Sequence, residues 1–138
     1  MKPSVGKVIM TVGTTVVAVS INAGVILVGS PAEGRREQLD STRVEDLKRI
    51  MSATDSFWER NARLPESLEE LTEDARAEVS NVDPGSAEPY DYVVSGEESY
   101  ELCATFDGES TAPVRSSADF WRHGAGRQCF ELTVDTSG

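Results

Sequence analysis

The sequence has little of what most catalytic and metal centres are built from. It contains one histidine, His123, and two cysteines, Cys103 and Cys129, among 138 residues. A zinc site takes several His and Cys ligands at close spacing, so this composition argues against one. No motif places a nucleophile beside a base, and Gly124–Gly126 lacks the spacing of a phosphate-binding loop. We therefore predict no catalytic residue, no cofactor and a protein that is not an enzyme.

Positive charge is also scarce. The chain has 13 Lys and Arg against 24 Asp and Glu, a formal net charge of −11 at pH 7. Lys2 and Lys7 precede every acidic residue, so the rest of the chain carries a formal charge of −13. A surface of this sign repels the phosphates of nucleic acids and anionic lipid headgroups. We predict no nucleic-acid partner and interpret the acids as a solvated surface.

Charge is absent altogether from residues 8–29, which read VIMTVGTTVVAVSINAGVILVG. These 22 residues would span roughly 33 Å as a helix, enough to cross a bilayer. The short N-terminal flank favours a signal-anchor with the N-terminus in the cytoplasm. The alternative is a cleavable signal peptide cut after Ala32, although its apolar core is usually shorter. Both interpretations place the following residues outside the cytoplasm, with the membrane as a partner of residues 8–29.

The two cysteines lie in the part of the chain that we expect to be exported. An oxidising compartment would pair Cys103 with Cys129. Closing the loop between them would stabilise the fold by roughly 3 kcal/mol. A metal site and a reactive thiol are the alternatives, and we favour the structural disulfide.

The pattern of residues predicts three parts: a transmembrane segment at 1–29, a juxtamembrane linker at 30–41 and an extracytoplasmic domain at 42–138. Thr42 and Glu45 match a capping box, which predicts that a helix begins at Thr42 and runs to about residue 61. Apolar residues then recur at helical spacing, and charged residues occupy the other face. The expected apolar face includes Val44, Leu47, Ile50 and Phe57, and the expected polar face includes Arg43, Asp46, Lys48, Arg49, Asp55 and Glu59.

Beyond Pro65 the pattern predicts a second, short helix that continues to about residue 79, and then a loop at 81–89. The period of the apolar residues changes to two after Pro89, which indicates a β-hairpin. The expected strands are 90–94, 100–106 and 128–134, with a loop at 107–118. We therefore predict an α+β fold, with one amphipathic helix packed on a small antiparallel sheet of about three strands.

Three further groups of residues have a functional and a structural interpretation. Acids near the expected loops, above all Asp83, Asp91 and Asp107, suit calcium, but no EF-hand spacing is present and we favour surface acids. His123 could act as a base or a ligand, and we favour a structural bond to a loop carbonyl. The aromatic residues of the hairpin could bind a glycan or a peptide, and we favour a place in the core. These aromatic residues are Tyr90, Tyr92, Tyr100 and Phe106.

Residues 43–106 resemble the globular half of type IV pilin-like proteins, especially the major pseudopilin of type II secretion. The strings that carry the resemblance are Phe57-Trp58, Asn61 to Pro65, Ser67-Leu68-Glu69-Glu70-Leu71, Asp83-Pro84, Pro89-Tyr90-Asp91-Tyr92 and Tyr100-Glu101-Leu102. The resemblance implies a long helix on a small antiparallel sheet, with sheet loops that often bind calcium. It does not extend to the N-terminus, where the family's leader motif is absent: Gly6 precedes Lys7, and the first Glu is Glu33.

The sequence thus predicts a single-pass protein of the cell membrane with its C-terminal domain outside the cytoplasm. We expect a non-enzymatic domain that has a structural role or interacts with envelope proteins. A pilin or pseudopilin subunit of a secretion or fibre assembly is the first alternative. An envelope hydrolase is the second, and it would require a nucleophile and a base that the sequence does not reveal.

Overall fold

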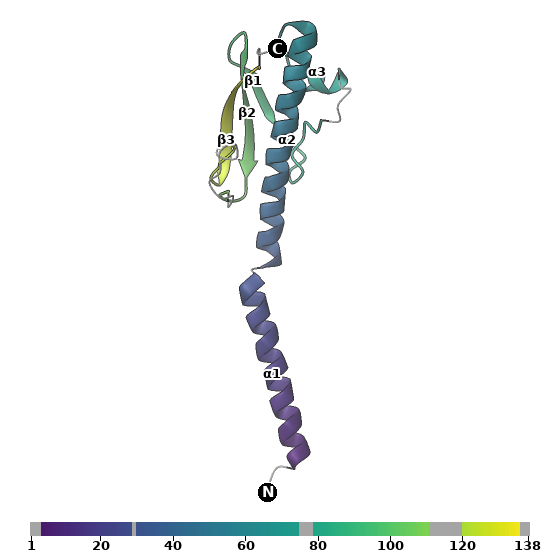
Figure 1. Ribbon diagram of the computed structural model, residues 1–138, viewed down its shortest axis with the longest axis vertical. Helices are drawn as coiled ribbons and strands as arrows, with labels where there is room; N and C mark the ends of the chain where they lie inside the picture. The colour runs from purple at the N-terminus through teal and green to yellow at the C-terminus, as the bar shows by residue number, and fades with distance from the viewer. Residues whose placement is uncertain (1–3, 29, 75–78, 111–119, 136–138) are drawn as a thin grey trace. The chain divides into compact units, whose positions relative to one another are not determined.

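The computed structural model describes residues 4–28, 30–74, 79–110 and 120–135. The chain divides into two compact units, Met1–Arg35 and Arg36–Gly138. Its class is α+β, as predicted, with an apolar helix at the N-terminus and a three-stranded antiparallel sheet in the second unit (Figure 1). The elements are α1 (Val5–Val28), α2 (Pro31–Asn61), α3 (Leu68–Glu73), β1 (Asp91–Val94), β2 (Ser99–Phe106) and β3 (Gly126–Thr133).

Helix α1 is long and apolar enough over Val5–Gly24 to cross a membrane, and none of this stretch is buried within the protein. Its polar side chains bond to the helix itself. The amide of Asn22 donates to the carbonyl of Ala18 at 2.7 Å, and four hydroxyl groups donate to the carbonyl four residues earlier. This internal pairing lowers the cost of placing polar groups in an apolar environment.

Helix α2 begins at Pro31, so the prediction of a linker at 30–41 and a helix start at Thr42 was wrong. The sequence contains two capping boxes, and the structure uses the first. The backbone N–H of Glu33 donates to the hydroxyl of Ser30 at 3.2 Å, and Pro31 occupies the first helical position, which it suits. Thr42 lies inside the helix, where its hydroxyl donates to the carbonyl of Gln38.

The end of α2 at Asn61 agrees with the sequence prediction. Ala62 follows in the left-handed region with a φ of 52°, which stops the helix. The chain then enters α3, where the hydroxyl of Ser67 accepts a bond from the N–H of Glu70. Helix α3 ends at Glu73, and the predicted continuation towards residue 79 falls partly on 75–78, outside the described residues.

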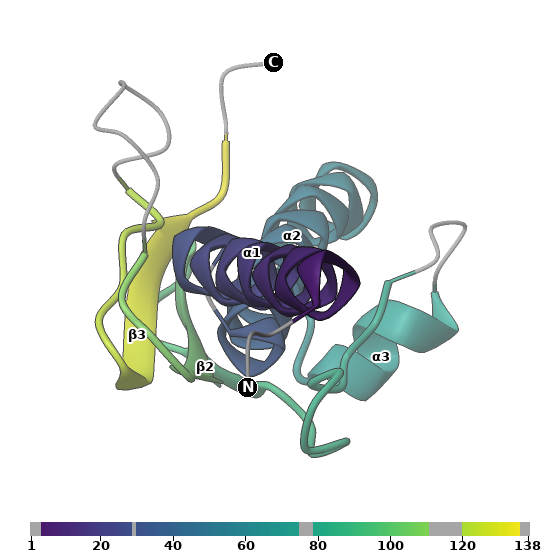
Figure 2. The ribbon, with the colours of Figure 1, turned by 90° about the horizontal axis from the view of Figure 1, so that it is seen from below.

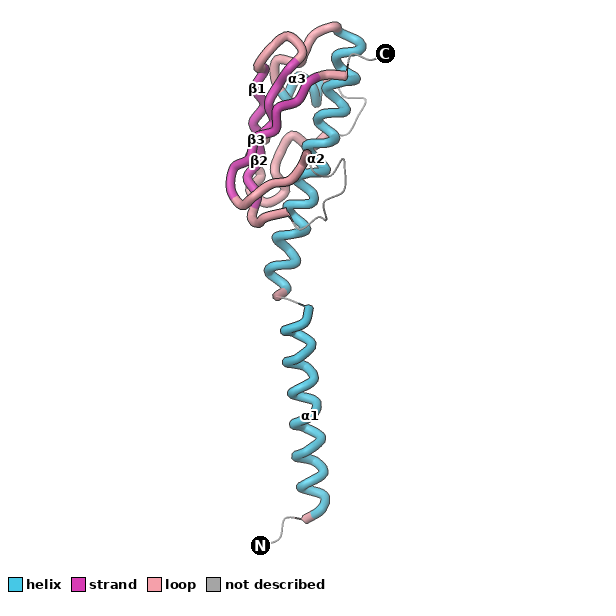
Figure 3. The backbone as a smooth tube through the Cα atoms, turned by 60° about the vertical axis from the view of Figure 1, so that its left-hand side comes forward, coloured by secondary structure: helices cyan, strands magenta, loops and turns pink. Residues whose placement is uncertain are grey.

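The sheet has the order β1-β2-β3, and both pairs of strands are antiparallel. The strand boundaries lie within two residues of the predicted ones, and the predicted loop at 107–118 is described only as far as residue 110. Figure 3 shows the three strands side by side along α2, and Figure 2 shows β2 and β3 towards one side of the view and α3 towards the other. Leu102 pairs with Tyr92 on β1 and with Phe130 on β3, which sets the register of the sheet.

The core lies between α2 and the sheet, and α3 contributes Leu68 and Leu71 to it. The expected apolar face of α2 is buried at Leu47, Ile50 and Phe57, while Val44 is partly buried. The hairpin aromatics are core residues rather than an exposed binding face, since three are buried and one is partly buried. The buried ones are Tyr90, Tyr100 and Phe106, and the partly buried one is Tyr92.

Candidate functional site

The most unusual feature of the second unit is a buried arginine on α2. Arg43, expected on the polar face of the helix, is only 5% exposed. Its Nη1 lies 2.6 Å from an Oδ1 of Asp40 and 2.8 Å from Oδ2 of Asp107, and its Nε lies 2.5 Å from Oδ2 of Asp83. We call these four residues the Arg43 cluster.

The carboxylates of the Arg43 cluster also accept backbone bonds. Asp40 accepts from the N–H groups of Asp107 and Gly108, both at 2.9 Å, and Asp83 accepts from those of Gly85 and Ser86. These bonds join three segments that are far apart in the sequence: α2, the loop before β1 and the chain that leaves β2. The cluster therefore holds the loops to the helix at one end of the sheet.

The electrostatics of the Arg43 cluster favour the charged forms. Burial would raise the pKa of Asp83, but the Arg43 guanidinium and the N–H groups of Ser86 and Gly85 outweigh it and hold that pKa below its usual value. The bond to Asp83 likewise raises the pKa of Arg43, although burial opposes it. The guanidinium is thus surrounded by three carboxylates and donates hydrogen bonds to all of them.

Another buried acid of α2, Asp46, lies about one turn beyond Arg43. Asp46 was also expected on the polar face, but it is buried and accepts a bond from the hydroxyl of Tyr90 at 3.0 Å. Burial raises the pKa of Asp46 above its usual value, and the Tyr90 hydroxyl partly offsets this. Burial and the Asp46 carboxylate raise the pKa of Tyr90. The pair extends the polar contacts between α2 and the start of β1.

The two buried tyrosines provide a matched test of this pair. We expect Tyr90→Phe to lower the free energy of unfolding by about 1.5–3 kcal/mol, because Asp46 loses its hydroxyl donor in the interior. We expect Tyr100→Phe to change it by less than about 0.5 kcal/mol, since the buried Tyr100 hydroxyl has no hydrogen-bond partner among the described residues. Urea titration followed by tryptophan fluorescence measures both, and equal losses would contradict the assignment.

A cavity of about 540 Å³ opens beside the Arg43 cluster, bounded by the loop before β1 and by the end of β2. Asp83, Asp91 and Asp107, the calcium candidates from the sequence, all line it. Asp83 and Asp107 come together there, but the guanidinium of Arg43 binds both carboxylates and supplies the positive charge. Asp91 pairs with Arg127 at 3.0 Å. Two of these acids, Asp83 and Asp107, thus belong to the Arg43 cluster, whereas Asp91 forms an exposed ion pair.

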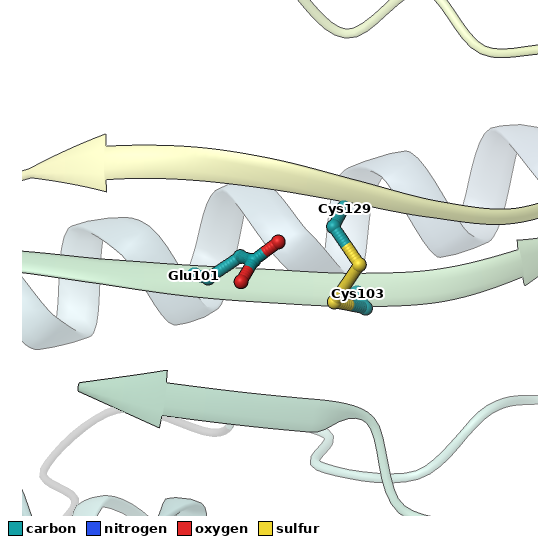
Figure 4. Close-up of side chains that lie close together, drawn as sticks. All are labelled: Glu101, Cys103 and Cys129. Carbon is teal, nitrogen blue, oxygen red and sulfur yellow. A yellow bond between two sulfur atoms is a disulfide. The ribbon is translucent and has the colours of Figure 1, made fainter. Parts of the chain in front are cut away.

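Cys103 and Cys129 form a disulfide between β2 and β3, which is the pairing the sequence predicts. Figure 4 shows the bond with Glu101 beside it, and the carboxylate and the two sulfur atoms lie within 4.8 Å of one another. Such a group could resemble a metal site, but sulfur atoms bonded to each other offer no thiolate. The disulfide explains the grouping.

His123 has the structural environment that we favoured from the sequence. Its ring stacks on Phe106 with the centroids 3.7 Å apart, and its Nδ1 lies 3.2 Å from the carbonyl oxygen of Gly108. The imidazole is buried. Its contacts fix the segment after β2 against the segment before β3, close to where Asp40 binds the N–H of Gly108.

The buried charges of α2 were not predicted, although the sequence contains a signal for them. The buried positions of the helix recur at alternating steps of three and four residues, and the same stripe continues through Asp40 and Arg43. Extending the apolar face towards the N-terminus would have placed both side chains at the interface with the sheet. The stripe is Asp40, Arg43, Leu47, Ile50, Thr54 and Phe57, and Asp46 is buried beside it.

No protein-family model matches the chain, and no curated protein sequence or solved structure matches it either.

Proposed function

We propose that the chain is a membrane-anchored, extracytoplasmic and non-enzymatic domain that works through protein contacts at the cell envelope. Helix α1 carries this proposal. Its stretch Val5–Gly24 is apolar, long enough to cross a bilayer and entirely unburied within the protein. An apolar helix of this length gains a favourable environment in lipid, where its backbone bonds are already satisfied internally.

The disulfide supports the placement of the second unit outside the cytoplasm. Cys103 and Cys129 are bonded to each other, and such bonds persist in oxidising compartments and are rare in the cytosol. The acidic surface supports the same view, because an excess of negative charge keeps a domain soluble and away from anionic headgroups. The N-terminus would then lie in the cytoplasm, with Lys7 at the membrane boundary.

Extraction of membranes with alkaline carbonate tests the anchor. We expect the chain to stay in the membrane pellet, and the double change Val16→Lys and Val19→Lys to release it. Two charges near the centre of the span cost about 5–7 kcal/mol on insertion scales. The control makes the same changes at Val82 and Val93, which are exposed in the second unit, and should stay in the pellet. Release of the unchanged chain would contradict the proposal.

A pilin or pseudopilin subunit is the second candidate. It is favoured by one observation, a helix of 31 residues packed on a three-stranded antiparallel sheet, which is the layout that the resemblance implies. The intact mass of the full-length protein from its own membrane separates the candidates. Cleavage with N-methylation near Gly6 would favour the subunit, an uncleaved chain would favour the anchor, and a cut after Ala32 would favour a secreted domain.

A further inference from the structure

We propose that the open edge of β1 and the groove beside it bind an extended, basic segment of a partner protein, which adds a strand to the sheet. This proposal rests on the protein-contact part of the proposed function and names the surface and the chemistry of the partner. The groove lies between β1 and the chain that connects α2 to α3. We define the β1 groove by Trp58, Leu64, Glu66, Val94 and Glu97, and its volume is about 620 Å³.

The backbone of β1 offers bonding groups that β2 does not use. Ser95 pairs with Ser99, since its N–H donates to the Ser99 carbonyl. Bonded residues alternate in an antiparallel pair, so the N–H and C=O groups of Tyr92 and Val94 point away from β2. No described residue outside the sheet forms a backbone bond to either of them. An incoming strand could form hydrogen bonds with these four groups, the N–H and C=O of Tyr92 and of Val94.

The chain already covers the neighbouring part of the same edge. Val82 forms an isolated antiparallel bridge with Pro89, and the N–H of Tyr90 donates to the carbonyl of Asn81. Among the described residues this coverage stops before Tyr92, and within that part of the chain only the end of β1 towards the hairpin turn lacks a covering strand. A partner strand would therefore continue the line in which residues 81–82 lie. Strand addition at a free edge is a common mode of peptide recognition.

Apolar side chains flank the open edge. Val93 is 53% exposed and Val94 is 45% exposed, in a strand that is at the edge of the sheet. Proteins usually protect such edges with charge, with proline or with a covering segment. Leu64 is buried in the opposite wall, and the Tyr92 hydroxyl donates to the carbonyl of Pro65 at 3.0 Å, which fixes that wall to β1. An apolar side chain of the partner would pack against Val94.

The charges at the β1 groove select a basic partner. Glu66 and Glu97 both line it. Arg63 also lines it, but its guanidinium binds Glu70 at 2.5 Å and lies over the ring of Phe57. A second copy of this chain would bring another formal charge of −11. Like charges disfavour that occupant, and complementary charge favours lysine or arginine on the incoming strand.

The test uses the full chain in zwitterionic detergent micelles and fluorescent pools of eight-residue peptides, in which Lys or Arg alternates with Val, Ile, Leu or Tyr. We expect these pools to bind, and acidic pools with Glu in place of the basic residues not to bind. Methylation of every second peptide nitrogen should abolish binding, because it removes the bonds to the strand edge. Amide NMR shifts should centre on Tyr92 and Val94.

Matched variants locate the site. We expect Val94→Lys to weaken binding about tenfold, the loss that corresponds to the burial of one valine side chain. Val82→Lys, the same change at an exposed valine outside the groove, should leave binding within about twofold. Glu97→Lys should weaken binding, whereas Glu131→Lys on β3 changes the net charge equally and should not. Thermal unfolding of each variant checks that it folds.

Several results would overturn the proposal. These are a failure of the basic pools to bind, equal binding to wild type and Val94→Lys, or equal binding of the methylated peptides. Self-association of the chain that Val94→Lys abolishes would show that the occupant is a second copy. Carbonate extraction distinguishes a failure of the membrane-anchor proposal from a failure of the β1 groove proposal. A chain that stays in the membrane and binds no peptide contradicts the groove alone, whereas a released chain that binds peptide contradicts the anchor alone.

Discussion

Replacing Arg43 with methionine should lower the free energy of unfolding by about 3–5 kcal/mol, the usual loss when one partner of a buried ion pair is removed. Asp40 and Asp83 are themselves buried, so the variant would leave two carboxylates in the interior without their counter-charge. Asp107 is more exposed, and water can compensate it. The loss should therefore come mainly from Asp40 and Asp83.

Urea titration of the full chain in micelles, followed by the fluorescence of Trp58 and of the buried Trp121, measures this loss. Arg49→Met is the matched control, because the Arg49 side chain is 60% exposed and its Nη1 lies 3.9 Å from Asp46. A contact of this length, with the Arg49 side chain in solvent, contributes less than about 1 kcal/mol. Similar losses in both variants would show that the Arg43 cluster does not stabilise the fold.

The effect of Arg43→Met should also depend on pH, and the sign follows from Asp83. The pKa of Asp83 is held below its usual value, so its contribution to stability is present above the unfolded pKa of about 3.9 and is lost as the pH falls through the folded one. In the variant, burial without the guanidinium raises the pKa, and protonation relieves the cost. The difference between wild type and variant should shrink from pH 7 towards pH 4, and a constant difference would contradict this account.

The sheet of this protein follows closely from its sequence. The change to a period of two after Pro89 and the turn before Tyr100 define the hairpin. The two cysteines then fix the third strand, because the register that buries Leu102 opposite Phe130 also places Cys103 opposite Cys129. Local periodicity and one covalent constraint were sufficient here, because the cysteine pair supplies the contact between β2 and β3 that periodicity alone does not give.

The start of α2 could not be predicted from local signals. Ser30 with Glu33 and Thr42 with Glu45 are equally good capping boxes. The choice between them depends on tertiary contacts, because Asp40 binds the N–H groups of Asp107 and Gly108 only if the helix already includes it. A helix that began at Thr42 would lose this contact between α2 and the end of β2.

The Arg43 cluster could not be predicted from the sequence for a similar reason. A charged residue on a helix is assigned to the solvent face unless its partners are known. The two acids that compensate Arg43 besides Asp40 are 40 and 64 residues away, in loops whose positions the pattern leaves open. The stripe of buried positions indicates that Arg43 faces the sheet, but only the fold shows that Asp83 and Asp107 meet it there.

Removing the disulfide should have the second large effect. We expect the double variant Cys103→Ala and Cys129→Ala to lose about 3–4 kcal/mol of unfolding free energy in the chain-entropy account, because the bond closes a loop with a sequence separation of 26. Alanine avoids adding an unpaired hydroxyl at the buried Cys103. Urea titration of the oxidised wild type and the variant measures the difference.

Reductant provides the internal control for this prediction. Dithiothreitol should shift the urea midpoint of the wild type to that of the double variant and leave the variant itself unchanged, because only the closed loop distinguishes them. The register of β2 and β3 is also held by Leu102 and Phe130 in the core, so the reduced chain should keep its sheet in the absence of urea. A loss below about 1 kcal/mol would mean that the packing of these strands alone sets the stability, and that the bond restrains an unfolded chain that is already compact.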